Sequence, residues 1–250
     1  MQGKRKVIMS IAGFDPSGGA GILSDIKTIE AHKIYGLGIT SAITFQNDDE
    51  FTGVNWLSVQ DIERQIELQT KKFKIEGIKI GLVESLDTLE TLVVNLREYL
   101  PKVPIVWDPI LKASAGFEFH KGIDSAKLEN ILTKVTLITP NWNEASALSN
   151  SKDSKLGALE MSRLCMVYLK GGHNEGDKGR DYLFHKGEQN NFKPKKIIQT
   201  EKHGSGCVLS TSLLCNLVKG YPLIKACLRA KDYTAHFLNS NKTLLGYHKI

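Results

Sequence analysis

The sequence predicts an α/β fold in which a mostly parallel sheet lies between two layers of helices. Apolar runs of strand length alternate with segments of helical period along most of the chain. This alternation is typical of strands that are buried on both faces by crossover helices. The length of 250 residues also suits one large α/β unit. We therefore expect residues 1–250 to form a single domain.

The alternating pattern assigns an order of elements to the first two thirds of the chain. Buried strands are expected at Val7–Ala12, Gly38–Phe45, Ile75–Leu82, Ile105–Pro109, Val135–Thr139 and Met166–Lys170. Helices are expected at Gly19–Lys33, Val59–Lys72, Leu86–Leu100, Ser125–Thr133 and Asn143–Leu148.

The last third of the chain predicts a hairpin followed by two helices. We expect the hairpin strands at Asp181–His185 and Lys195–Thr200, with a polar turn at Gly187–Asn191 between them. The helices are expected at Cys207–Lys219 and Leu223–Leu238. A glycine that stops the first helix and a proline that opens the second separate them.

Composition and charge narrow the possible partners. The formal charge is +6, but lysine and arginine are spread along the chain, which disfavours a nucleic-acid module. No apolar stretch approaches the roughly 20 residues that a bilayer crossing needs. The four cysteines form no closely spaced pair, as expected for free thiols in the reducing cytoplasm.

A glycine-rich loop follows the first predicted strand. Residues 13–21 read Gly-Phe-Asp-Pro-Ser-Gly-Gly-Ala-Gly and lead into a helix, so a ligand could lie against bare backbone there. The dinucleotide fingerprint is incomplete, because Ser24 occupies the place of its last glycine, and the Gly-Lys-Ser/Thr of a phosphate-binding loop is missing. Taken alone, these glycines are better explained by a simple tight turn than by a ligand site.

A second glycine-rich helix start is His203-Gly204-Ser205-Gly206-Cys207. Unpaired backbone N–H groups and the positive end of a helix form an anion hole, which can stabilise a phosphoryl group during transfer. Cys207 lies in the first turn, where the helix field is expected to lower the thiol pKa and favour proton acceptance. The alternative is a tight turn beside a small buried cysteine.

Polar residues also follow three other predicted strands. Asn141 and Glu144 are three residues apart at a helix start, so they could bind magnesium together or simply cap the helix. Asp108 ends an apolar strand, where an acid is better placed for a site than for packing. Lys170 emerges from a strand into two glycines and could neutralise a triphosphate.

Read together and in order, these motifs resemble the hydroxymethylpyrimidine and phosphomethylpyrimidine kinase family, a vitamin-kinase branch of the ribokinase-like fold. The resemblance covers the chain from Val7 to about Leu238. It rests on Ile11–Gly21, Thr44–Asn47, Ile78–Gly81, Asp108–Pro109, Thr139–Asn141, Lys170–His173 and His203–Cys207.

The resemblance implies a fold, an activity and cofactors. The fold would be a ribokinase-like three-layer α/β/α arrangement with a C-terminal hairpin and two helices. The activity would be ATP-dependent phosphorylation of 4-amino-5-hydroxymethyl-2-methylpyrimidine, then of its monophosphate, in thiamine biosynthesis. ATP and Mg²⁺ are the implied cofactors, and a monovalent cation stays open. The family also implies a homodimer with a small-molecule substrate and neither nucleic-acid nor membrane partners.

The same resemblance assigns roles to individual residues. The anion hole would comprise Gly204, Ser205, Gly206 and Cys207, with Cys207 as the base. Lys170 would contact phosphate, and magnesium and ATP would be organised by Asp108, Asn141 and Glu144. The pyrimidine would lie against Gly13, Ala20, Asp25, Gln46, Leu82 and Ile110, where the polar side chains of Asp25 and Gln46 would satisfy its nitrogens.

Some positions depart from the family pattern. Phe14 replaces a common serine, Leu82 replaces a methionine, and the usual Ala-Lys-Ser-Gly is scrambled across residues 112–116, which receive no role. The segment between Glu144 and Lys170 is short, and we expect little room there for the usual helix.

Two alternatives remain within the same fold. A pyridoxal or pyridoxine kinase can share the cysteine and the glycine-rich start, although Gln46 and the complete opening loop favour the pyrimidine. A non-catalytic vitamin-binding homologue would not need the combination of Asp108, Glu144, Lys170 and Cys207.

Overall fold

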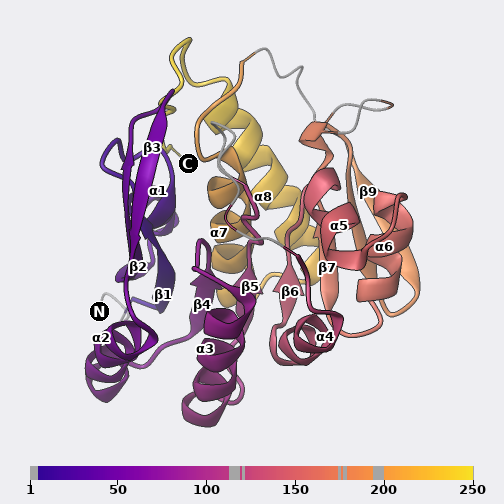
Figure 1. Ribbon diagram of the computed structural model, residues 1–250. Helices are drawn as coiled ribbons and strands as arrows, with labels where there is room; N and C mark the ends of the chain where they lie inside the picture. Colours follow the sequence, from indigo (N-terminus) through magenta and orange to yellow (C-terminus); the bar gives the residue numbers. More distant parts are fainter. Residues whose placement is uncertain are drawn as a thin grey trace.

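The computed structural model is built around one nine-stranded sheet (Figure 1). It describes residues 5–112, 119, 122–173, 176, 179–193 and 200–249. The strand order is β3-β2-β1-β4-β5-β6-β7-β8-β9. Pairing is parallel from β2 through β1 and β4 to β7, and antiparallel at both edges. The expected mostly parallel sheet is therefore confirmed.

The strands are β1 (Val7–Phe14), β2 (Tyr35–Gln46), β3 (Phe51–Trp56), β4 (Gly77–Ile80), β5 (Ile105–Trp107), β6 (Leu137–Ile138), β7 (Met166–Leu169), β8 (Asp181–His185) and β9 (Glu188–Phe192). The helices are α1 (Gly21–Ala31), α2 (Val59–Lys72), α3 (Leu86–Tyr99), α4 (Ser125–Lys134), α5 (Trp142–Ser149), α6 (Ser154–Met161), α7 (Ser205–Val218) and α8 (Leu223–Leu238), and a 3₁₀ turn spans Gly171–His173.

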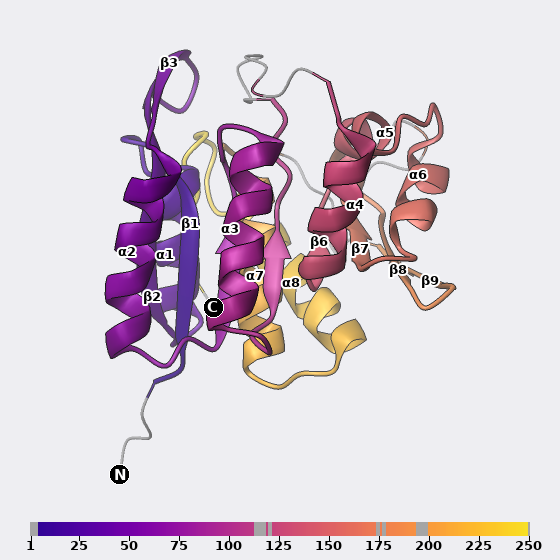
Figure 2. The ribbon, with the colours of Figure 1, turned by 60° about the horizontal axis from the view of Figure 1, so that its bottom comes forward.

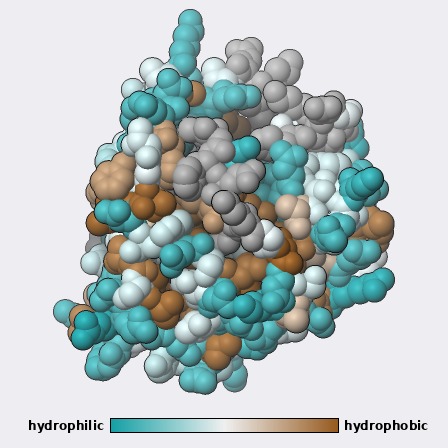
Figure 3. Space-filling view, viewed as in Figure 1, coloured by the Kyte–Doolittle hydropathy of each residue, from teal (hydrophilic) through white to brown (hydrophobic). Residues whose placement is uncertain are grey.

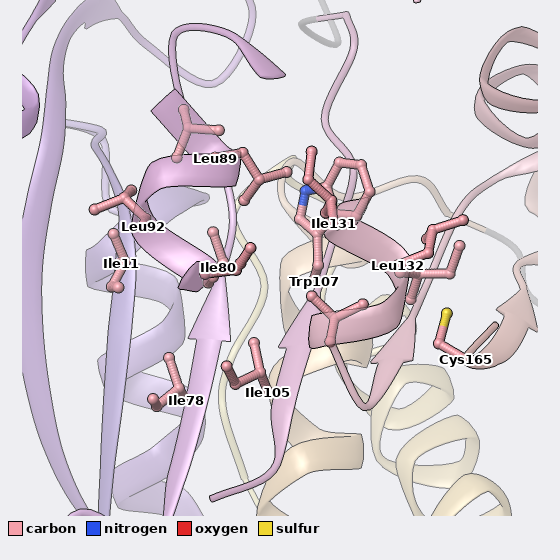
Figure 4. Packing of buried hydrophobic residues seen from close by; sticks show 14 of the residues in the cluster. Ile11, Ile78, Ile80, Leu89, Leu92, Ile105, Trp107, Ile131, Leu132 and Cys165 are labelled. Atoms are coloured by element: carbon pink, nitrogen blue, oxygen red, sulfur yellow. The ribbon is translucent and has the colours of Figure 1, made fainter. Parts of the chain in front are cut away.

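Helices cover both faces of the sheet, as the hydrophobic pattern predicts. The larger core cluster joins one sheet face to α2 through α6, and Figure 4 shows Leu89, Leu92 and Ile131 packed over Ile80 and Trp107. The second cluster joins the other face to α1, α7 and α8. Figure 2 shows α2, α3 and α4 in front of the sheet and α7 and α8 behind it.

Local sequence explains where the outer helices begin. Ser58 precedes α2, and its Oγ accepts a hydrogen bond from the Asp61 amide at 3.1 Å. Ser85 precedes α3 and accepts one from the Thr88 amide in the same way. Each serine satisfies an amide that the helix itself leaves unpaired. The predicted bounds of α2 are confirmed, and those of α3 are correct within one residue.

The C-terminal hairpin exists, but its second strand was placed wrongly. The expected polar turn at Gly187–Asn191 is mostly β9, whereas residues 195–199 of the strand expected at Lys195–Thr200 lie outside the described residues. The actual turn is Lys186-Gly187, with φ values of 52° and 77°. Two consecutive positive φ values define a tight I′ hairpin turn, which leaves the following polar residues free to pair with β8.

Two elements were missed. Strand β3 pairs antiparallel with β2 after a turn in which Asn47 Oδ1 accepts hydrogen bonds from the amides of Asp49 and Glu50. The expectation of little room between Glu144 and Lys170 is also wrong, because α6 fits there. Gly157 allows α6 to approach α5 closely: a Cβ at that position would lie 2.0 Å from Ser149 Oγ.

Polar and charged side chains occupy much of the face in Figure 3, with apolar side chains between them. Among the described residues, no helix has both the length and the apolar composition needed to cross a bilayer.

Candidate active site

The glycine-rich loop after β1 and the helix start at α7 meet at the carboxyl ends of the strands. Asp15 joins them: its Oδ2 accepts a hydrogen bond from the Ala20 amide at 2.8 Å and lies 2.9 Å from His203 Nε2. Its Oδ1 accepts a hydrogen bond from the Ser17 amide. One buried carboxylate therefore fixes the first loop and ties it to the second.

Glycine is required at one position in each loop. Gly204 has a φ of 73°, and a Cβ there would lie 2.0 Å from the carbonyl oxygen of Gly19. Gly21 has a φ of 57°, and its Cβ would lie 2.1 Å from the Gly13 carbonyl oxygen. Both positions combine a left-handed backbone with direct backbone contact, which excludes other side chains. The glycines therefore do more than make tight turns.

The first turn of α7 faces a lysine and a carboxylate. A Cβ on Gly206 would lie 3.3 Å from Lys170 Nζ and 3.8 Å from Asp108 Oδ2. Gly204 is the N-cap, so the amides of Ser205, Gly206 and Cys207 belong to the turn that has no intrahelical acceptors. The Ser205 amide donates a long hydrogen bond of 3.4 Å to the Lys202 carbonyl oxygen. These amides and the helix dipole make the cavity at this point favourable for an anion.

Asp108 and Lys170 form a buried ion pair opposite that turn. Lys170 Nζ lies 2.7 Å from Asp108 Oδ1, which also accepts a hydrogen bond from Thr139 Oγ1 at 3.0 Å. Burial opposes ionisation of Asp108, but the charges of Lys170 and Lys79 outweigh it and hold the pKa of Asp108 below its usual value. Burial likewise opposes the charge on Lys170, but Asp108 and Glu144 raise its pKa above the ordinary value. The pair is therefore charged at neutral pH.

Asn141 and Glu144 cap α5 and line the same cavity. Asn141 Oδ1 accepts a hydrogen bond from the Glu144 amide at 2.9 Å, and Glu144 Oε2 accepts one from the Asn141 amide at 2.6 Å. This is a complete capping box, so the simpler of the two sequence interpretations is confirmed. Glu144 Oε2 also lies 3.7 Å from Lys170 Nζ. Burial is the main reason that the pKa of Glu144 rises to about 7.

The donor set suits a magnesium ion that keeps most of its water. Within the described residues, no three His, Cys, Asp or Glu side chains gather as a metal cluster. Asp108 and Glu144 nevertheless present carboxylates to one cavity on either side of Lys170. Mg²⁺ is commonly held by one or two carboxylates together with water and substrate phosphates. The residues therefore fit magnesium bound with a nucleotide.

The cavity has a volume of about 1830 Å³ and includes nearly all the predicted site residues. Five of the six expected pyrimidine contacts line it: Gly13, Ala20, Gln46, Leu82 and Ile110. The expected phosphate and metal residues line it as well: Asp108, Asn141, Glu144, Lys170, Gly204, Ser205, Gly206 and Cys207. Apolar and charged residues thus line one cavity.

Asp25 is the exception, because it does not line the cavity where the pyrimidine was expected to contact it. Its side chain is fully buried and does not line the cavity. Its carboxylate oxygens accept hydrogen bonds from Ser10 Oγ at 2.6 Å, Thr211 Oγ1 at 2.7 Å and Lys79 Nζ at 2.8 Å. One turn into α1, Asp25 faces the sheet and α7 instead of the ligand space.

The expected lowering of the Cys207 pKa is also wrong for the ligand-free chain. Burial raises the pKa of the thiol to about 11, against the opposing effect of the Lys79 charge. Only 5% of the residue is exposed. The position at the start of α7 is as predicted, but desolvation of the thiolate dominates over the favourable field.

Several residues of the site region were missed from the sequence. Lys79 lies between two isoleucines of a buried strand, and a lysine in such a run is itself a signal. Asp15 and His203 belong to the recognised motifs but received no role. At the far end of the cavity, Asp181 Oδ2 accepts hydrogen bonds from Lys231 Nζ at 2.6 Å and Tyr168 Oη at 2.7 Å. No local pattern connects those three positions.

Comparison with known proteins agrees with this geometry. Residues 15–249 match the family described as phosphomethylpyrimidine kinase. A hydroxymethylpyrimidine/phosphomethylpyrimidine kinase of Aquifex aeolicus is 33% identical over 254 aligned residues, which cover 96% of this chain and 98% of the relative.

Solved structures show the same fold. A phosphomethylpyrimidine kinase of Clostridium difficile has a TM-score of 0.78 and 31% identity, covering 93% of this chain and 99% of its own. A Bacillus subtilis pyridoxal kinase in complex with ADP has a TM-score of 0.81 and 26% identity, covering 95% and 93%. These similarities confirm the expected vitamin-kinase architecture. The converging glycine loops and the match over nearly the whole length together show that the chain belongs to the phosphomethylpyrimidine kinase family.

Proposed function

We propose that this enzyme transfers the γ-phosphoryl group of ATP first to the hydroxymethyl group of 4-amino-5-hydroxymethyl-2-methylpyrimidine and then to the resulting monophosphate. The observation that carries the proposal is that the expected pyrimidine contacts and the expected phosphate contacts line one cavity. Gly13, Ala20, Leu82 and Ile110 supply apolar lining and Gln46 a polar side chain, and the first turn of α7 lines the same cavity.

The residues of the chain support phosphoryl transfer by placement and electrostatics. In the first reaction, the substrate hydroxyl oxygen attacks the γ-phosphorus, the bond to the bridging oxygen breaks, and ADP leaves with the electron pair. The amides of Ser205, Gly206 and Cys207 would stabilise the negative charge on the phosphoryl oxygens. Lys170 would neutralise charge on the nucleotide phosphates from the opposite wall.

Magnesium is proposed as the cofactor that neutralises the phosphates and orders them. Asp108, Asn141 and Glu144 would hold it, directly or through water. Asp108 is ionised by its basic neighbours, so one full carboxylate charge is available at neutral pH. Glu144, with its pKa of about 7, supplies a second charge once the cation arrives.

The proton released by the substrate is proposed to pass to Cys207 Sγ. A thiol with a pKa of about 11 is protonated at neutral pH, and a general base works best when its pKa lies near the working pH. Cys207 can therefore act as a base only where neighbouring positive charge stabilises its thiolate in the occupied site.

An assay with purified enzyme tests the substrate. ATP, Mg²⁺ and either the hydroxymethylpyrimidine or pyridoxal are supplied, and products are followed by mass spectrometry. We expect the pyrimidine monophosphate and then the diphosphate. The Gln46→Leu variant should raise KM for the pyrimidine about tenfold or more, because one polar edge loses its partner. Gln60→Leu, on the exposed side of α2, is the control. Turnover of pyridoxal alone would overturn the substrate assignment.

Pyridoxal kinase is the second candidate, and one finding favours it. The Bacillus subtilis pyridoxal kinase has the higher TM-score, 0.81 against 0.78, although its sequence identity is lower, 26% against 31%. A similar backbone shows a shared fold, whereas the side chains that line the cavity determine whether a pyrimidine or a pyridine ring is bound. The higher sequence identity to the phosphomethylpyrimidine kinase and the presence of Gln46 therefore favour the pyrimidine as the substrate.

Assembly and location follow as parts of the same proposal. Phe14, Ile43 and Phe45 are exposed on β1 and β2, and Phe14 pairs in register with Ile43. This apolar patch supports a homodimer, which light scattering would detect. The four cysteines are free thiols, which supports a cytoplasmic enzyme.

A further inference from the structure

Directly beneath the cavity floor, Lys79 and Asp25 form an ion pair that the proposed reaction does not use. Both side chains are fully buried, and Lys79 Nζ lies 2.8 Å from Asp25 Oδ2. Burial disfavours the charge on Lys79, but attraction to Asp25 outweighs it and raises the lysine pKa above its ordinary value. A permanent positive charge therefore lies inside the protein.

The side chain of Lys79 extends toward the end of the sheet where the ligand site lies. Lys79 is on β4, and its side chain runs along the strand toward the carboxyl end, because a Cβ on Gly81 would lie only 2.6 Å from Lys79 Nζ. Leu82, which directly follows Gly81, lines the cavity. Lys79 thus lies one layer below the ligand space.

Asp25 connects Lys79 to the helix that carries Cys207. Thr211 Oγ1 donates a hydrogen bond to Asp25 Oδ1 at 2.7 Å, and Thr211 follows Cys207 by four residues on α7. Side chains four residues apart lie on the same helix face. The face of α7 that bears the thiol therefore rests on the ion pair.

The groups around the thiol shift the pKa of Cys207 in opposite directions. Asp25 on α1 and Asp108 after β5 raise the pKa of Cys207, whereas Lys79 and the backbone amide of Gly21 lower it. Among these groups Lys79 has the largest effect after burial itself. Lys170, after β7, also interacts with the thiol. Two lysines from different strands thus act on this sulfur.

We propose that Lys79 is an electrostatic positioning residue, whose buried ammonium group stabilises the thiolate form of Cys207 from which the base step of the proposed kinase reaction starts. Asp25 keeps Lys79 charged and oriented, which explains why this carboxylate faces away from the ligand. A buried ion pair is seldom more stabilising than an apolar pair, so stability alone does not account for it. This inference rests on the proposed role of Cys207.

The test compares the wild type with the Lys79→Met variant. The double variant Lys79→Met/Asp25→Asn is included because it leaves no unpaired buried charge, so it can be measured if the single variant fails to fold. The rate of Cys207 alkylation by iodoacetamide is followed against pH by peptide mass spectrometry, without substrate. We expect the apparent pKa of the thiol to rise by about one unit or more in Lys79→Met, because a nearby cation is lost. The rise should be smaller in the double variant, because the loss of the Asp25 carboxylate partly offsets the loss of Lys79. Lys71→Met, on the exposed face of α2, is the matched control.

Kinetics separate this role from a structural one. We expect kcat to fall about tenfold or more while KM for the pyrimidine changes less than about threefold. An unchanged alkylation profile in the folded variants would overturn the role of Lys79, even if kcat falls. Since alkylation needs no turnover, that result is independent of the substrate assignment, whereas a failed kinase assay would count against the proposed function and leave the thiol measurement valid.

Discussion

Cys207 combines a position suited to catalysis with a thiol that is neutral in the ligand-free protein. It lies in the first turn of α7 and lines the cavity, but burial raises its pKa to about 11. The other three cysteines are buried outside the cavity lining. A single thiol is therefore available to the ligands.

Replacement of Cys207 by alanine should remove turnover and preserve binding. We expect kcat to fall by about 10² or more, the size of a lost general base, while the pyrimidine Kd measured by calorimetry changes little. Cys165→Ala, in the core under α6, serves as a control for the loss of a thiol elsewhere. Wild-type kcat in Cys207→Ala would remove the thiol from the mechanism.

At the scale of elements, a buried histidine joins α1, α7 and α8. His32 Nδ1 lies 2.9 Å from the Thr28 carbonyl oxygen, and its Nε2 lies 3.0 Å from Ser212 Oγ. Its ring packs edge-on against Tyr233 with centroids 4.7 Å apart. Burial is the main reason that the pKa of His32 falls to about 4. The cluster is therefore built around a neutral ring.

This histidine should make the fold sensitive to mild acid. Unfolded His32 binds a proton near pH 6.5, and folded His32 only near pH 4, so stability falls as pH drops between these values. Between pH 7 and 5 we expect His32 to account for a loss of about 2 kcal/mol in the free energy of unfolding, measured by urea titration. The His32→Gln variant should show a correspondingly smaller loss.

The control for that experiment is His236→Gln, since His236 is exposed on α8. It should keep the wild-type dependence on pH. His248, whose pKa burial also lowers to about 4, should leave part of the acid sensitivity in every variant. If His32→Gln and wild type lose equal stability between pH 7 and 5, the buried ring does not stay neutral as described.

Sequence patterns predicted the elements that are defined by local features such as caps and periodicity. They failed for the elements that are defined by contacts with other parts of the chain. Helix α2 has its serine cap and an apolar stripe, and both are visible in the sequence. Strand β9 is polar, Glu-Gln-Asn-Asn-Phe, and only its pairing with β8 makes it a strand. Helix α6 is so short that its close packing through Gly157 defines it more than its periodicity does.

The same distinction applies to the site. Glycine-rich loops at strand ends were recognisable, and the structure brings them together at Gly19 and Gly204. The burial of Asp25 could not be predicted, because its partners Lys79 and Thr211 are 54 and 186 residues away in the chain. The thiol pKa was misjudged because the helix field is a local cue, whereas desolvation depends on the whole surrounding fold.

At the scale of the whole molecule, the C-terminal segment after α8 supports the anion-hole loop. Lys202 Nζ donates hydrogen bonds to the carbonyl oxygens of Asn241 and Thr243, the former at 2.7 Å. The His203 amide donates one to the Leu244 carbonyl oxygen at 3.0 Å. Residues 241–244 therefore fix the loop that precedes α7.

Loss of the Lys202 contacts should weaken nucleotide use through this loop. We expect Lys202→Met to raise KM for ATP about threefold to tenfold and to speed hydrogen exchange of residues 241–249. Lys242→Met removes an exposed lysine of the same segment and is the matched control. Wild-type exchange in Lys202→Met would show that the segment stays in place without this side chain.

The contact between Gly19 and Gly204 determines when the active site can form during translation. Helix α1 is translated well before α7 and α8, its neighbours on that face of the sheet. A nascent chain must therefore wait with apolar surface on β1 and α1 uncovered, which makes it a natural client for chaperones. Catalytic competence should therefore arise abruptly, once α7 has left the exit tunnel.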